Sequence, residues 1–135
     1  TATDEIAIAP VYDCGSCLYP QADEAIMRDT IDKQPERDFR TFSIPLSSIK
    51  VNGKKINYFD FISSLENADC SKALKRILPK INMDAIFRIV DETPFISDLQ
   101  KQFYKTMLRT RKERILDFAM EKLRKREKAK ELDAR

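Results

Sequence analysis

The stretch SDLQKQFYKTMLRTRKERILDFAMEKL, residues 97–123, decides the fold class, because its apolar side chains recur with the period of an α-helix. Ser97 stands where a helix N-cap is expected, one position before the periodic pattern begins. The residues that mostly share one face are Leu99, Phe103, Met107, Ile115, Phe118, Ala119 and Leu123. The apolar face weakens after Leu123, so we predict a long C-terminal helix over about 97–135 with a fraying, charged end.

Shorter helices are predicted upstream of this stretch. Three of them span about 57–65, 69–78 and 82–91, and each opens on an Asn or Asp that can cap its first turn. Another helix is predicted over 22–33, where a proline soon follows as a stop signal. The middle and the end of the chain are therefore mostly helical.

Extended structure is predicted in two places. Residues 6–12 are apolar and β-branched, which favours a short buried N-terminal strand. In residues 39–56, apolar residues surround Asn52-Gly53, the dipeptide typical of a tight β-hairpin. The sequence thus predicts a mainly α fold with a short N-terminal strand and a small β-hairpin.

Composition limits the class of protein. The 135 residues are 42% hydrophobic and 35% charged, which suits one domain spanning 1–135 with a modest core. Only two glycines are present, too few for a Gly-rich phosphate loop. The chain has no histidine, so Ser-His-Asp and Cys-His catalytic sites and two-His metal sites are excluded.

The sequence predicts that this protein has no membrane partner. The sequence holds no run of about 20 apolar residues and no secretory signal pattern at its start. We therefore expect a cytoplasmic protein. Its three cysteines are an odd number, which favours reduced thiols over a disulfide framework.

Asp13 is the first candidate for a functional residue. It follows the predicted strand and precedes a turn, a place from which a carboxylate can hold a magnesium ion that bridges phosphates. The alternative is that Asp13 only caps the loop, as Asp often does at turns. On spacing alone the capping interpretation is favoured.

A family resemblance bears on this choice. The run Ala9-Pro10-Val11-Tyr12-Asp13 resembles the A-P-x-Y-D stretch of HipA-like serine/threonine kinases. The resemblance implies that Asp13 binds the magnesium ion on ATP and that Tyr12 and Asp13 belong to the cofactor site. It also implies a helical C-terminal lobe like that of small bacterial members of the family.

The rest of such a kinase is missing from the sequence. The family's catalytic loop contains a histidine, and its nucleotide-binding lobe carries a phosphate-contacting loop and a lysine. The resemblance therefore implies a C-terminal fragment that is inactive alone, because phosphoryl transfer needs both lobes. The implied partners are the upstream lobe of the same polypeptide, a protein substrate and an antitoxin-like protein. Mg²⁺ and ATP would bind the intact parent, with neither held tightly by this fragment.

A second hypothesis is a non-enzymatic helical protein-interaction module. Residues 109–135 carry 11 Lys and Arg against 6 Asp and Glu, a surface that could meet phosphates or acidic proteins. Pairs such as Glu121 and Lys125 at helical spacing favour a solvated, salt-bridged face instead. No aromatic residue follows Phe118, so nucleic-acid binding by base stacking is not expected.

Two further groups have both a structural and a functional interpretation. Cys14 and Cys17 have the C-x-x-C spacing of a redox dithiol or half a zinc site, but the favoured interpretation is a pair of small semi-buried thiols flanking a turn. Aromatic residues recur along the helices and predict core packing rather than a ligand pocket. They are Tyr58, Phe59, Phe61, Phe87, Phe95, Phe103 and Tyr104.

Overall fold

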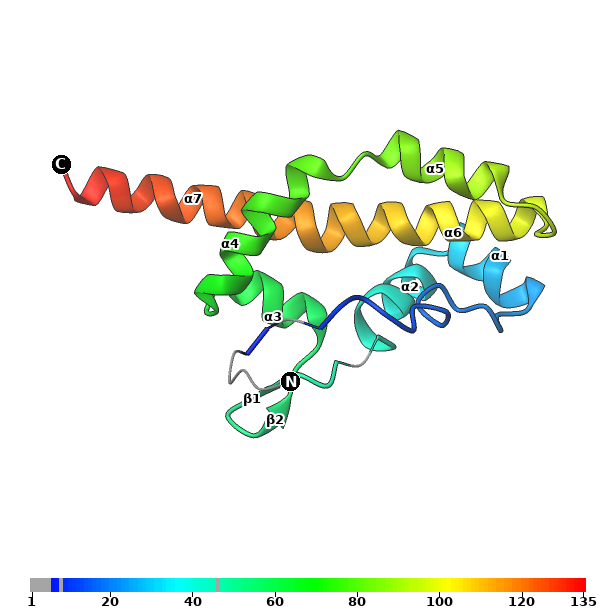
Figure 1. Cartoon of the computed structure of the whole chain (residues 1–135), viewed down its shortest axis with the longest axis horizontal. Helices are drawn as coiled ribbons and strands as arrows, with labels where there is room; N and C mark the ends of the chain where they lie inside the picture. Colours follow the sequence, from blue (N-terminus) through cyan, green and yellow to red (C-terminus); the bar gives the residue numbers. More distant parts are fainter. Residues whose placement is uncertain (1–5, 8, 46) are drawn as a thin grey trace.

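A long C-terminal rod organises the chain in the computed structural model, which describes residues 6–7, 9–45 and 47–135 (Figure 1). The rod consists of α6 (Asp98–Arg111), a π-helical segment (Lys112–Asp117) and α7 (Phe118–Asp133). Ser97 and Gln100 form a reciprocal capping box, with N···O distances of 3.1 and 2.8 Å. The charged end predicted to fray remains helical as far as Asp133.

The first N-terminal helix packs against α6, and the second packs against the first. They are α1 (Glu24–Asp32) and α2 (Gln34–Asp38), and a π-helical segment (Phe39–Ser43) continues α2. Met27 of α1 meets Phe103 and Met107 of α6 in a buried cluster. We call this cluster the α6 core. The predicted helix over 22–33 therefore corresponds to α1.

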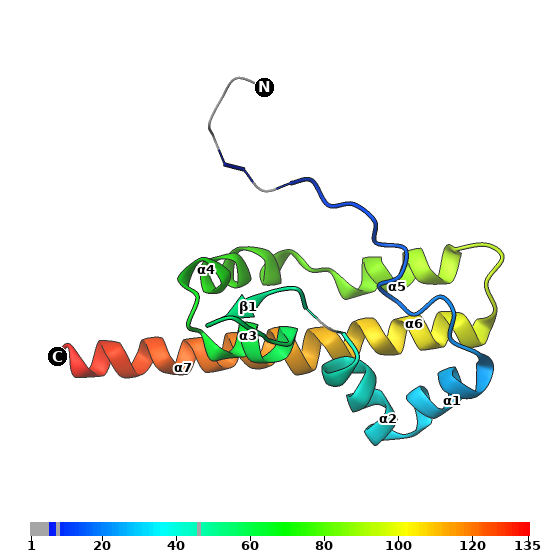
Figure 2. The ribbon, with the colours of Figure 1, turned by 90° about the horizontal axis from the view of Figure 1, so that it is seen from below.

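A second buried cluster lies under the other half of the rod. It is formed by α3 (Tyr58–Ser64), α4 (Ala68–Ile77) and α7, and we call it the α7 core. Its members are Leu65, Leu74, Ala119, Met120 and Leu123. After a 3₁₀ turn (Leu78–Lys80), α5 (Met83–Glu92) returns along α6, as Figures 1 and 2 show.

Asparagine side chains cap three of these helices. The side-chain oxygens of Asn57, Asn67 and Asn82 accept hydrogen bonds from backbone N–H groups three residues later, at 2.7–3.0 Å. The prediction that Asp69 caps the fourth helix was wrong, because Asn67 has the extended backbone that a cap requires. Asp69 instead lies in the first turn, where its charge favours the helix dipole.

The predicted hairpin forms, whereas the segment before it is helical. Strands β1 (Lys50–Val51) and β2 (Lys54–Lys55) pair antiparallel around Asn52 and Gly53, whose φ values of 52° and 78° suit a type I′ turn. Residues 39–43, predicted as extended, form the π-helical segment. The Thr41 hydroxyl donates to the Arg37 carbonyl, one turn earlier, at 2.7 Å.

No N-terminal strand forms among the described residues 6–7 and 9–13; residue 8 of the predicted strand lies outside them. Figure 2 shows residues 9–12 outside the helical body, with no strand beside them. Val11 is 90% exposed. A β-branched sequence without a pairing partner has no ladder of hydrogen bonds to join, so it stays irregular.

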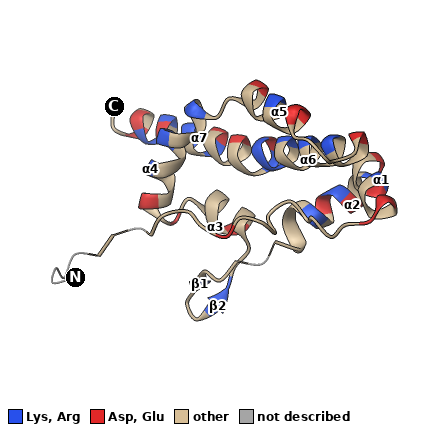
Figure 3. Cartoon of the chain, turned by 45° about the vertical axis from the view of Figure 1, so that its right-hand side comes forward, with Lys and Arg blue, Asp and Glu red and all other residues tan. Residues whose placement is uncertain are grey.

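Charged residues of both signs alternate along the rod (Figure 3). Glu121 and Lys125 form the expected surface ion pair at 3.1 Å. Two other cationic side chains of α7 connect it to the end of α3. Lys122 donates to the Ser63 carbonyl at 2.8 Å, and Arg126 donates to the Leu65 carbonyl at 2.9 Å. Within the described residues no helix is both long enough and apolar enough to cross a bilayer.

Candidate functional site

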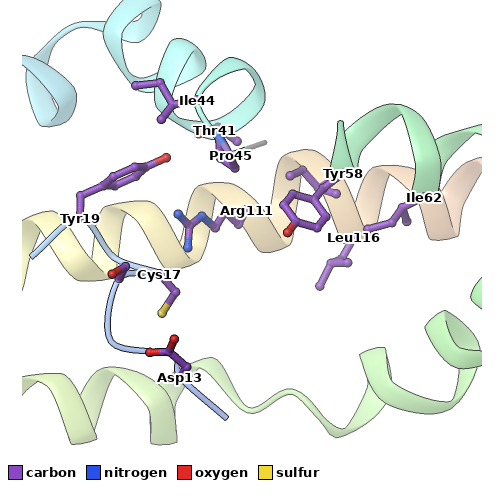
Figure 4. A pocket seen from close by; sticks show the side chains of 12 residues that line it. Asp13, Cys17, Tyr19, Thr41, Ile44, Pro45, Tyr58, Ile62, Arg111 and Leu116 are labelled. Atoms are coloured by element: carbon purple, nitrogen blue, oxygen red, sulfur yellow. The ribbon is translucent and has the colours of Figure 1, made fainter. Parts of the chain in front are cut away.

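A cavity of about 670 Å³ lies between the α6 core and the α7 core (Figure 4). Its wall is built by the loop after Asp13, the π-helical segment that continues α2, helix α3 and the middle of the rod. The residues that line it are Asp13, Ser16, Cys17, Tyr19, Thr41, Ile44, Pro45, Tyr58, Ile62, Arg111, Ile115 and Leu116. It is mostly apolar, with one acid and one base among these residues.

The two π-helical segments help to shape this cavity. Thr41 belongs to the first segment, and Ile115 and Leu116 belong to the second. Arg111 is the last residue of α6, directly before the second segment. A π turn inserts an extra residue into a helix and is common at functional sites, because it turns neighbouring side chains toward a new direction.

Asp13 reaches the cavity through a strained turn. Its φ of 53° is left-handed, a conformation that Asp and Asn tolerate better than most residues. The chain then turns back, with backbone hydrogen bonds from Cys17 to Cys14 at 3.2 Å and from Tyr19 to Ser16 at 3.3 Å. Figure 4 shows the Asp13 carboxylate at the mouth of the cavity, below Cys17.

Tyr12 does not join Asp13 in the cavity. Its side chain is 80% exposed and is not among the lining residues. The resemblance implies that both residues contact the cofactor, and the fold of this chain brings only Asp13 to the cavity. The roles of Tyr12 and Asp13 stay predictions.

Arg111 and Tyr19 meet at the cavity, a pairing that the sequence did not reveal. The Tyr19 hydroxyl donates to the Arg40 carbonyl at 2.7 Å, which fixes the ring. The guanidinium carbons of Arg40 and Arg111 each lie 5.7 Å from the centre of this ring. The sequence does not distinguish Arg111 from the other basic residues of the same stretch, so it does not predict a role for Arg111 at this cavity.

The donor atoms at the cavity suit magnesium only in part. No group of three or more His, Cys, Asp or Glu gathers within the described residues. Magnesium in phosphoryl-transfer sites is held by one or two carboxylates, with nucleotide phosphates and water completing its shell. Asp13 fits one such position, and the other protein ligands would come from outside this chain.

The thiols of the C-x-x-C pair are exposed rather than semi-buried. Cys14 and Cys17 are free, and Cys14 Sγ contacts the carbonyl oxygen of Tyr12 at 3.7 Å. Cys70 is half-buried in α4. A structural zinc site needs four ligands, and the described residues offer no third ligand beside this pair.

These environments predict different thiol reactivities. Burial raises the pKa of the Cys70 thiol, so at any given pH a smaller fraction of Cys70 is the reactive thiolate. Iodoacetamide should therefore alkylate Cys14 and Cys17 faster than Cys70, as followed by peptide mass spectrometry. In denaturant the three rates should converge. Equal rates in the native protein would contradict this placement.

The aromatic residues divide between core and surface. Phe103 is fully buried, and Phe59 packs with Phe42 and Phe118 at ring-centre distances of 5.0 and 5.4 Å. These residues follow the core interpretation. Phe95 is fully exposed in a loop, and the half-exposed Tyr58 lines the cavity, so the prediction was wrong for these two.

Comparison with known proteins bears on this arrangement. No protein-family model matches the chain. A curated relative, the serine/threonine-protein kinase CtkA of Helicobacter pylori, is 47% identical over 116 residues. The match covers 85% of this chain and 36% of that kinase. The resemblance is to part of a kinase. The chain thus spans little more than a third of the curated relative.

The fold comparison agrees. The crystal structure of a Helicobacter pylori proinflammatory kinase, CtkA, matches with a TM-score of 0.80 and 44% sequence identity. The superposition covers 92% of this chain and 46% of that one. The expected fold class, a mainly helical domain like a kinase C-terminal lobe with a small hairpin, is confirmed.

Proposed function

We propose that this chain is the C-terminal part of a HipA-like protein serine/threonine kinase. The observation that carries the proposal is the similarity to a serine/threonine-protein kinase over 85% of the chain. It is supported by Asp13, which ends the A-P-V-Y-D run and lines a cavity in the middle of the fold.

In this proposal Asp13 supplies one carboxylate ligand to the magnesium ion on ATP. The ion neutralises charge on the phosphates when it is bound. The hydroxyl oxygen of a serine or threonine forms a bond to the γ-phosphorus, and the bond from that phosphorus to the bridging oxygen of ADP breaks. The group that takes the hydroxyl proton lies outside this chain.

The other parts of the proposal concern partners. The upstream lobe of the same polypeptide would close the nucleotide site, and a protein would be the phosphoryl acceptor. An antitoxin-like protein follows from the HipA-like resemblance and belongs to the same proposal, as does the cytoplasmic location expected from the sequence. The isolated chain would be inactive, because it lacks the base and the lobe that position ATP.

The full-length polypeptide that contains this sequence tests the proposal. Incubated with Mg²⁺, γ-labelled ATP and a protein acceptor, it should form labelled phosphoserine or phosphothreonine. A chelator of divalent cations should stop the transfer, and residues 1–135 alone should transfer nothing. A full-length protein that binds no ATP and transfers no label would contradict the proposal.

Such a failure would favour the protein-interaction module. The observation behind that alternative is the end of α7, which projects beyond the helical body in Figures 1 and 2. It carries basic residues and Leu132, which is 70% exposed. The kinase hypothesis is preferred because the similarity to a kinase covers 85% of the chain.

A further inference from the structure

Among the described residues, Arg111 is the only basic one that lines the cavity beside Asp13. It is the last residue of α6 and is partly buried. Figure 4 shows its guanidinium inside the cavity, between Tyr19 and the loop that carries Cys17 and Asp13. The side chain is thus directed toward the loop that carries the proposed metal ligand.

The guanidinium of Arg111 has no protein acceptor among the described residues. Other arginines of the fold do have acceptors: Arg37 donates to the Ile31 carbonyl at 2.7 Å, and Arg114 pairs with Asp38 at 3.2 Å. A guanidinium has five N–H donors, and those of Arg111 are not among the buried polar atoms that lack a partner, so in the free protein they face solvent in the cavity. An anion of matching shape would satisfy these donors.

Stacking holds this guanidinium in place before any ligand arrives. Arg111 lies over the Tyr19 ring at 5.7 Å, and the Tyr19 hydroxyl is tied to the Arg40 carbonyl at 2.7 Å. A guanidinium held in a fixed orientation loses less conformational freedom when it binds a ligand. The arrangement therefore suits a preformed binding group better than a freely moving surface charge.

Asp13 and Arg111 line one cavity without forming an ion pair within the described part of the chain. Space for a third group therefore lies between opposite charges. A phosphate that shares a magnesium ion with Asp13 would present its remaining oxygens to such a guanidinium, and the two match as a bidentate pair.

We propose that Arg111 binds a terminal phosphate of the magnesium-bound nucleotide, across the cavity from Asp13. The inference rests on the proposed kinase function. It adds a second phosphate-site residue from the opposite end of the sequence. Tyr19 serves as the positioning residue that orients the guanidinium.

The test measures nucleotide binding by the full-length protein rather than its activity. Isothermal titration with ATP·Mg²⁺ and with adenosine, which has no phosphate, compares wild type with Arg111→Gln and Arg111→Lys. Arg88→Gln is the matched control, because Arg88 is exposed on α5 and does not line the cavity. Thermal melting identifies any variant that fails to fold.

Arg111→Gln should weaken ATP·Mg²⁺ binding by about 10- to 100-fold, the usual loss when a charge-assisted hydrogen bond to a phosphate is removed. Its affinity for adenosine should not change. Arg111→Lys should recover part of the loss, because it keeps the charge without the planar fork. Arg88→Gln should bind as the wild type does.

Two results would overturn the inference. Equal ATP·Mg²⁺ affinity in Arg111→Gln and wild type would mean that no phosphate contacts this residue. An equal loss for ATP·Mg²⁺ and adenosine would show that Arg111 only supports the fold. Both results are distinct from failure of the proposed function, in which the wild-type protein itself neither binds ATP·Mg²⁺ nor transfers phosphate.

Discussion

Replacing Asp13→Asn in the full-length protein is expected to lower kcat for phosphoryl transfer by about 100-fold or more. Asparagine keeps the size of the side chain but removes the negative charge that holds Mg²⁺. A metal ion contributes several kcal/mol of transition-state stabilisation, and each 1.4 kcal/mol is about tenfold in rate. The loss should appear in kcat, measured with γ-labelled ATP at saturating Mg²⁺.

The control for this variant is Asp133→Asn. Asp133 is an exposed carboxylate at the last residue of α7, and it does not line the cavity. Its replacement should leave kcat unchanged. The thermal midpoints of both variants should stay close to that of the wild type, because Asp13 is exposed and makes no ion pair in the described structure. Full activity in Asp13→Asn would remove Asp13 from the site.

The substitution Phe103→Ala is expected to lower the free energy of unfolding of the 135-residue chain by about 3–5 kcal/mol. Phe103 is fully buried and packs with Met27 and Met107 where α1 crosses α6. Removing the ring loses its burial and leaves a cavity that the surrounding helices fill only in part. Chemical denaturation followed by circular dichroism measures the change.

Phe95→Ala is the matched control, because the Phe95 side chain is fully exposed. Substitutions at exposed positions usually change the free energy of unfolding by no more than about 0.5 kcal/mol. We therefore expect the Phe95 variant to unfold like the wild type. A Phe103→Ala variant as stable as the Phe95 variant would contradict the position of Phe103 in the core.

Local sequence signals predicted most of the helices and the hairpin. Ser97 and Asn82 cap their helices through hydrogen bonds to residues three positions away, so the signal and its partner lie in one short segment. Asn52 and Gly53 likewise form their turn without help from distant residues. The position of Asp13 in the A-P-V-Y-D run was also visible in the sequence.

Predictions failed where the outcome depended on distant parts of the chain. The apolar residues 9–12 suggest a strand, but a strand forms only when another strand supplies hydrogen bonds, and the described structure provides none beside them. Residues 39–43 were predicted to be extended, yet they continue α2 as a π-helical segment that packs near α6. Tertiary contacts overrode the local propensity in that segment.

The sequence by itself determined that this protein is mainly helical and that a carboxylate follows an A-P-V-Y run. Only the tertiary structure decided that Asp13 shares a cavity with Arg111 and that Tyr12 does not. Caps and turns are short-range and can be seen in sequence. The cavity, in contrast, depends on how the loop after Asp13, the π-helical segment after α2 and helix α3 pack around the rod, which brings together residues from opposite ends of the chain.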